Sequence, residues 1–171
     1  MSRINNATRN IKYGYVGMIV QLVLGFISRT VFIYTLGVTF LGVNGLYTNV
    51  LGVLSLAELG FGTAMNYSLY KPIAAIGDLE KIKSLMNLYK RAYRVIALVV
   101  SVMGLLLVPF LKYIIKDPGN ISIDELTIFY LIFLFNTVST YFVAYKYSLV
   151  NAEQKNYIQT NIQAITTLIT V

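Results

Sequence analysis

Long apolar runs that carry almost no charge limit what this chain can fold into more than any other feature. The first run extends over about residues 13–36, and others cover about 41–65, 95–115 and 126–150. A transmembrane helix needs about 20 apolar residues, so each run is long enough to cross a membrane. Only 12% of the residues are charged and the mean hydropathy is +0.67, whereas about a quarter of the residues of soluble domains are charged. We therefore predict an all-α, polytopic membrane helix bundle.

A fifth apolar run begins near residue 158 and is still apolar at residue 171, the last of the sequence. It predicts a truncated fifth transmembrane helix, so we expect the N-terminal part of a larger transporter. The first run is not a secretory signal, because it exceeds the usual apolar region of about 7–15 residues and lacks a small-residue cleavage site. It is predicted to remain as a transmembrane helix.

Basic residues gather at one end of the predicted helices. Eleven Lys and Arg lie in the N-terminal region, between residues 71 and 94, and around the exit of the fourth helix, whereas only Lys112 and Lys116 lie at the other end. Cytoplasmic loops carry this excess, so we predict a multi-pass protein of the cell membrane with a cytoplasmic N-terminus. The net charge of +7 is then a topology signal. It does not indicate nucleic-acid binding, because no continuous basic patch with aromatic stacking platforms is present.

The segment 66–94 is predicted to be a cytoplasmic loop that contains an amphipathic helix. Asp78 can cap this helix, and apolar residues follow at spacings of three and four. The pattern suits a helix on an anionic membrane surface, and it equally suits an extension of the third transmembrane helix.

Two charges, Arg29 and Glu58, interrupt the first two apolar runs. An ionisable group at membrane depth is costly unless it faces a bundle interior or a water-filled cavity, so each is a candidate functional residue. Small and polar residues share a face with each charge. They are Gly14, Gly17, Gln21, Gly25 and Ser28 in the first helix, and Gly45, Asn49, Gly52, Ser55, Gly62 and Asn66 in the second. Close helix packing explains the glycines. The two charges lie at different depths, so we expect separate partners for them.

Arg29 is predicted to bind an anionic substrate, with Gln21 and Asn49 as further substrate-binding residues. A guanidinium remains protonated and binds phosphate oxygens in a bidentate fork. Glu58 is predicted to exchange a proton or to coordinate Na⁺ as a coupling-ion site. The sequence contains no Cys and no His, and we predict no enzyme activity, cofactor or metal centre.

Three segments carry a family resemblance: LGVTFLGVNGLYTNVLGVLSLAELGFGTAMNYSLYKPIA, DLEKIKSLMNLYKRAYR and YKYSLVNAEQKNY. They resemble lipid-linked oligosaccharide flippases of polysaccharide and capsule biosynthesis, in the multidrug, oligosaccharidyl-lipid and polysaccharide exporter superfamily. The resemblance covers nearly the whole chain and is most specific in its first 95 residues. It implies 12 to 14 helices in two pseudo-symmetric lobes, and this chain would form most of the first lobe.

The same resemblance implies an undecaprenyl-diphosphate-linked repeat unit as the substrate, with membrane lipids and the polysaccharide polymerase machinery as further partners. Arg29 matches the family's use of a first-helix arginine to line the cavity. A cation-coupled multidrug antiporter of the same superfamily is the alternative. Such proteins often carry an acidic cation site on the first helix, which is absent here, although Glu58 keeps this reading open.

Two other classes of membrane protein make different demands on the sequence. A small membrane assembly subunit would require the chain to end naturally at residue 171. A membrane glycosyl- or acyltransferase would need a catalytic base or metal ligands, and the close acidic pairs of this sequence lie in loops without such support.

Overall fold

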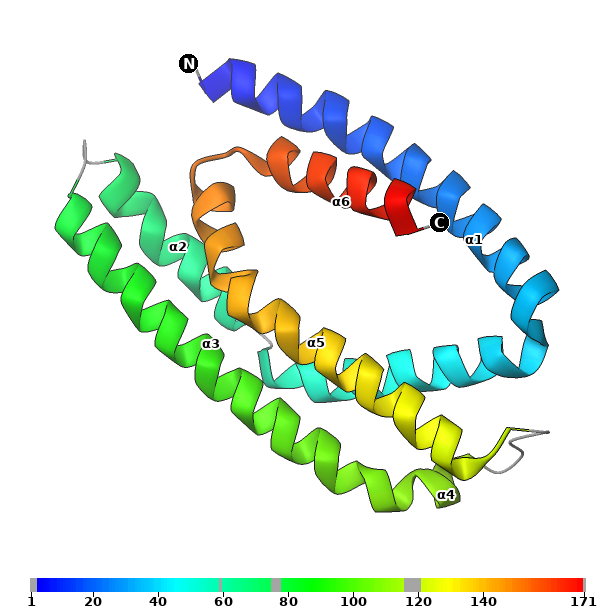
Figure 1. The fold of residues 1–171 in the computed structure, drawn as a ribbon. Helices are drawn as coiled ribbons and strands as arrows, with labels where there is room; N and C mark the ends of the chain where they lie inside the picture. The colour runs from blue at the N-terminus through cyan, green and yellow to red at the C-terminus, as the bar shows by residue number, and fades with distance from the viewer. Residues whose placement is uncertain (1–2, 59, 75–77, 116–120, 171) are drawn as a thin grey trace.

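The computed structural model describes residues 3–58, 60–74, 78–115 and 121–170 (Figure 1). All regular secondary structure in these residues is helical, which confirms the predicted all-α class. Three of the described segments are long and apolar enough to cross a membrane: Ala7–Leu54, Leu79–Ile114 and Ile123–Ala152. They indicate a membrane protein.

The longest helix, α1 (Arg3–Leu54), bends sharply at Gly37 and turns back on itself (Figure 1). Gly37 has φ 86° and ψ 170°, a conformation that a residue with a Cβ atom adopts only with strain. We call residues 3–36 the first arm and residues 38–54 the second arm. The predicted runs 13–36 and 41–65 leave residues 37–40 as a link between two helices. That link is wrong, because the helix resumes directly after the bend.

The predicted second helix, 41–65, is divided in the structure. The second arm is followed by a 3₁₀ turn, η1 (Ser55–Glu58), and then by α2 (Phe61–Ala74). Gly60 has φ 79°, which interrupts the helix and lets a new one start. A single helix over 41–65 is therefore wrong, and residues 66–74, which were assigned to a loop, are helical.

Helix α3 (Leu79–Leu107) is continuous, which favours an extension of the third membrane helix over a separate surface helix. The predicted cap is present, because the Asp78 side chain accepts a hydrogen bond from the backbone N–H of Lys81 at 3.2 Å. Pro109 lies in a 3₁₀ turn, η2 (Val108–Phe110), that leads into the short helix α4 (Leu111–Ile114). Pro109 thus lies where the α-helix gives way to a 3₁₀ turn, near the C-terminal end of the predicted third membrane helix.

Helix α5 (Ile123–Ala152) begins before the predicted residue 126, because a capping box starts it. The Ser122 hydroxyl accepts from the Glu125 backbone N–H at 3.2 Å, and the Glu125 carboxylate accepts from the Ser122 N–H at 3.3 Å. The last described helix is α6 (Asn156–Thr170).

The core lies where α2, α3, α5 and the second arm meet. The buried rings of Tyr47 and Tyr130 pack edge-on with their centroids 5.4 Å apart. Their hydroxyls donate to backbone carbonyls, Tyr47 to that of Leu126 at 2.8 Å and Tyr130 to that of Gly104 at 3.0 Å. These bonds satisfy polar groups where little water is present to do so.

We expect Gly104→Val to destabilise the fold. A Cβ atom at this position would lie 2.4 Å from Cδ1 of the buried Leu134, so α3 and α5 would have to separate or repack. Overpacking of this kind costs about 1–3 kcal/mol. The apparent melting temperature of the purified protein in detergent should fall, whereas Gly52→Val should change it little because a Cβ at Gly52 meets nothing within 4 Å. Equal melting of both variants would contradict this packing.

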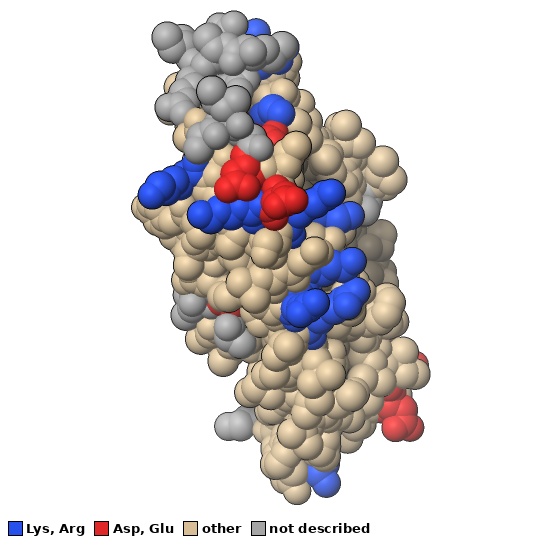
Figure 2. Space-filling view, turned by 90° about the vertical axis from the view of Figure 1, so that its left-hand side faces the viewer, with Lys and Arg blue, Asp and Glu red and all other residues tan. Residues whose placement is uncertain are grey.

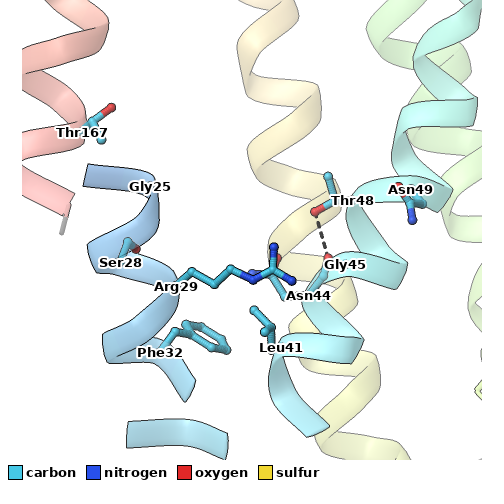
Figure 3. A pocket seen from close by; sticks show the side chains of 10 residues that line it. All are labelled: Gly25, Ser28, Arg29, Phe32, Leu41, Asn44, Gly45, Thr48, Asn49 and Thr167. Atoms are coloured by element: carbon cyan, nitrogen blue, oxygen red, sulfur yellow. Dashed lines mark hydrogen bonds between the residues drawn. The ribbon is translucent and has the colours of Figure 1, made fainter. Parts of the chain in front are cut away.

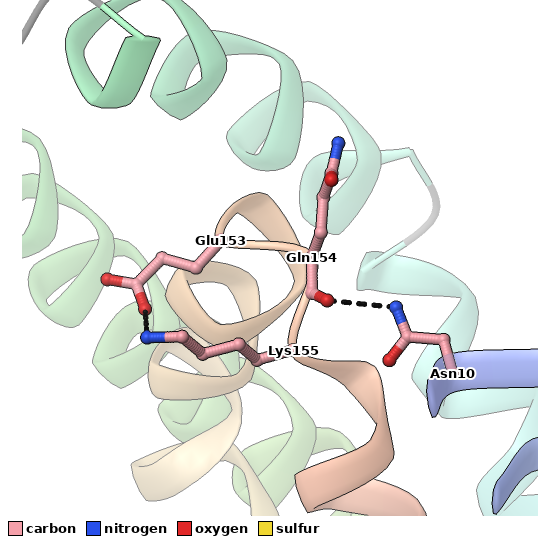
Figure 4. Close-up of polar contacts among 4 residues, drawn as sticks. All are labelled: Asn10, Glu153, Gln154 and Lys155. Atoms are coloured by element: carbon pink, nitrogen blue, oxygen red, sulfur yellow. Dashed lines mark hydrogen bonds and ion pairs between the residues drawn. The ribbon is translucent and has the colours of Figure 1, made fainter. Parts of the chain in front are cut away.

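The first arm packs on α6, away from the core (Figure 1). Asn10 joins the two. Its Nδ2 donates to the Gln154 carbonyl at 2.9 Å (Figure 4). Its Oδ1 accepts from the Tyr157 backbone N–H at 2.9 Å. Asn10 thereby satisfies a backbone donor in the first turn of α6, as a capping residue would. A Cβ at Gly17 would lie 2.3 Å from Thr160 Cγ2, so the arm and α6 approach closely.

The turn between α5 and α6 contains Gln154, which has φ 60°, and a local ion pair. The Lys155 ammonium lies 2.6 Å from the Glu153 carboxylate (Figure 4). This hydrogen bond, together with the charge attraction, raises the pKa of Lys155.

Asn10→Ala should loosen the first arm from this turn. The variant loses two hydrogen bonds, each with a net value of about 1 kcal/mol, and leaves the Gln154 carbonyl and the Tyr157 N–H without that partner. We expect a lower apparent melting temperature and faster proteolysis near residue 154. Asn87→Ala, at an exposed position of α3, is the matched control. If both variants melt like the parent protein, Asn10 does not stabilise the contact.

Candidate functional site

A cavity of about 490 Å³ lies between the two arms of α1 and reaches α6 (Figure 3). The first arm contributes four lining residues, the second arm five and α6 one. They are Gly25, Ser28, Arg29 and Phe32; Leu41, Asn44, Gly45, Thr48 and Asn49; and Thr167. The bend at Gly37 creates the cavity, because it folds the polar faces of the two arms toward each other.

Arg29 is the charged group of this cavity. Its side chain extends from the first arm toward Asn44 of the second arm (Figure 3). No acidic residue is among the described residues that line the cavity, and Arg29 forms no hydrogen bond or ion pair with another described residue. A guanidinium with five free donors is therefore directed into a polar space, where it can receive an anion.

Neutral polar groups surround Arg29. The Thr48 hydroxyl donates to the Asn44 carbonyl at 2.8 Å (Figure 3), which satisfies it within the helix. The amide side chains of Asn44 and Asn49 and the hydroxyl of Ser28 line the same space. Amides and hydroxyls both donate and accept, so this lining suits a ligand that carries many hydroxyl groups.

The structure brings together two of the three predicted substrate-binding residues. Arg29 and Asn49 both line the cavity, whereas Gln21 is exposed on the first arm and is not a lining residue. Sequence reasoning missed Asn44 and Thr48, although they are polar and one helical turn apart. It also missed Thr167, because nothing in the sequence indicated that α6 packs against the first arm.

Glu58 lies elsewhere. It lines a second cavity of about 320 Å³ at the helix break, together with Ser55, Leu56, Gly60, Gly62 and Thr63. The Tyr93 hydroxyl of α3 donates to Glu58 Oε1 at 2.5 Å. Arg29 and Glu58 therefore line different cavities, and they form no ion pair with each other.

An aromatic group supports the contact of Glu58. The Tyr93 ring stacks on Tyr141 of α5 with centroids 6.3 Å apart, and Phe61 of α2 packs edge-on against it at 5.8 Å. Tyr93 is buried, and Glu58 is half-buried. The carboxylate thus joins the helix break to α3 and, through the rings, to α5. Tyr93 as its partner could not be predicted, because the two residues are 35 positions apart.

The remaining charge is mainly basic and exposed. Lys and Arg side chains follow one flank of the molecule in Figure 2. On α3 they are Lys81, Lys83, Lys90, Arg91 and Arg94, all exposed. No group of three or more side chains that could hold a metal ion occurs in the described part of the chain.

Comparisons of this chain with models of protein families, with curated proteins and with solved structures found no match.

Proposed function

We propose that this chain is part of a flippase that moves undecaprenyl-diphosphate-linked oligosaccharide repeat units across the cell membrane for polysaccharide biosynthesis. The observation that carries the proposal is Arg29, a cation without a partner among the described residues, in a polar cavity between two apolar helical arms. Charged residues at membrane depth mark functional sites. We infer that the partner of Arg29 is an anionic substrate.

The chemistry of the cavity supports this substrate class. A diphosphate cannot cross hydrocarbon unaided, because transfer of an unpaired charge out of water costs many kcal/mol. The Arg29 guanidinium can bind two phosphate oxygens at once, while Asn44 and Asn49 can bind sugar hydroxyls. The lipid tail can remain in the bilayer while the headgroup crosses through the cavity.

The proposed arrangement has five membrane crossings: the two arms, α3 with α4, α5 and α6. The N-terminus is cytoplasmic, because the end with eleven basic residues faces the cytoplasm. These helices form most of the first lobe of a transporter of 12 to 14 helices, whose two lobes rock about the site in alternating access. The polysaccharide polymerase machinery would receive the exported unit.

A cation-coupled multidrug antiporter is the second candidate, and the Glu58 cavity favours it. The carboxylate is half-buried and accepts a hydrogen bond from Tyr93, so proton or cation binding there would disturb a contact between η1 and α3. An antiporter needs such a site. A flippase driven by an ion gradient needs it as well.

Complementation separates the two candidates. The complete gene is expressed in a strain that lacks its own repeat-unit flippase, and surface polysaccharide is measured together with the lipid-linked intermediate in the cytoplasmic leaflet. Restored surface polysaccharide with depletion of the intermediate supports the flippase. Drug resistance without restored surface polysaccharide would contradict the flippase and support the antiporter.

A further inference from the structure

A compact basic cluster lies where the apolar part of α3 begins. Lys90, Arg91 and Arg94 fall within about one and a half turns, and the next charged residue along the chain is Lys112. All three side chains of the cluster are exposed, and none forms an ion pair with a described carboxylate. Like charges three and four residues apart on a helix repel each other. The cluster is therefore uncompensated within the described part of the protein.

An exposed apolar row runs through this cluster. Leu88, Arg91, Val95 and Leu98 are spaced by three, four and three residues, so they share one face of α3. Leu88 is 59% exposed, Val95 62% and Leu98 64%. The row faces away from the core, and Arg91 lies within it. A cation next to exposed aliphatic side chains at the end of an apolar helix fits a ligand that has both a phosphate and an acyl chain.

We propose that Lys90, Arg91 and Arg94 bind the phosphate of an anionic glycerophospholipid whose acyl chain lies along Val95 and Leu98. The two arginines supply bidentate donors, and Lys90 adds a point charge. The cluster fits the depth of the headgroup layer, which is about 5–7 Å thick on each side of the hydrocarbon. Arg94 directly precedes Val95, and Lys90 lies about 7.5 Å before it along the helix.

The ordinary explanation of these charges is that they orient the protein in the membrane. The orientation of the protein depends on how many basic residues lie on one side of the membrane. It does not require these residues to form a cluster. Lys71 on α2, and Lys81 and Lys83 near the start of α3, provide a matched set of exposed basic residues that are predicted on the same side. Lys81 is ten positions from Arg91, which is about 15 Å along the helix.

The test compares two triple variants of the full-length protein, purified and reconstituted into phosphatidylcholine nanodiscs that contain a minor fraction of phosphatidylglycerol. One variant carries Lys90→Gln, Arg91→Gln and Arg94→Gln, and the other carries Lys71→Gln, Lys81→Gln and Lys83→Gln. Native mass spectrometry measures the phosphatidylglycerol that remains bound. We expect the first variant to retain it about tenfold less than the parent protein, and the second variant to retain it like the parent.

Equal retention by both variants would overturn the proposal, whether both keep the lipid or both lose it. Glycerol phosphate, which lacks acyl chains, should not displace the lipid at equal concentration, and displacement would show a phosphate site without lipid specificity. Should the first variant not fold, Arg91→Lys with Arg94→Lys replaces it. That pair keeps the charge but loses the guanidinium forks, so retention should fall, and unchanged retention would contradict the proposed site.

Discussion

Arg29→Ala should reduce export of the lipid-linked repeat unit by about ten- to a hundredfold. Hydrogen bonds to a charged group are worth about 1.5–3 kcal/mol, and this variant removes the cation of the cavity. Surface polysaccharide should be lost in the complementation strain, and the intermediate should accumulate in the cytoplasmic leaflet. Arg29→Lys should restore export only in part, because an ammonium keeps the charge but cannot form the bidentate fork.

Lys12→Ala is the matched control for charge. Lys12 is exposed on the same arm and lies outside the cavity, so its loss should leave export close to that of the parent protein. Membrane insertion and the amount of protein in the membrane fraction are measured for all three variants. Unchanged export by Arg29→Ala at normal protein levels would exclude an anion-binding role for this residue.

Much of the fold could be predicted, because lipid imposes a simple pattern on the sequence. Apolar runs of about 20 residues predicted the all-helical class and the long helical segments, although the run 41–65 is divided in the structure. The polar face of the first helix placed Arg29 in the cavity, and Asn49 of the second arm lines the same space. These features follow from the local spacing of apolar and polar residues, which can be read directly from the sequence.

Other features depend on contacts between distant residues, and periodicity does not encode them. The break at Gly60 was missed because glycine in a membrane helix also serves close packing, so Gly60 and Gly62 gave no distinct signal. Gln21 shares the polar face of the first arm but lies outside the cavity lining. The polar face thus extends beyond the cavity, and Gly17 uses part of it to pack against α6.

Glu58→Gln should remove most of any dependence of transport on proton or sodium gradients. Tyr93 donates to Glu58 Oε1, and the amide oxygen of Gln can accept the same hydrogen bond. The substitution therefore keeps the contact between the helix break and α3 while it removes the titratable charge. Transport is measured in reconstituted vesicles with and without an imposed gradient of each ion.

Tyr93→Phe makes the complementary change, because it keeps the carboxylate and removes its hydrogen bond. The ring can still stack on Tyr141, so the fold should lose about 1.5–3 kcal/mol, the value of one hydrogen bond to a charged group. Gradient dependence should persist in this variant, although its midpoint should shift with the loss of the donor. If Glu58→Gln transports with the same gradient dependence as the parent protein, then Glu58 serves as a structural link to Tyr93 and the coupling site lies elsewhere.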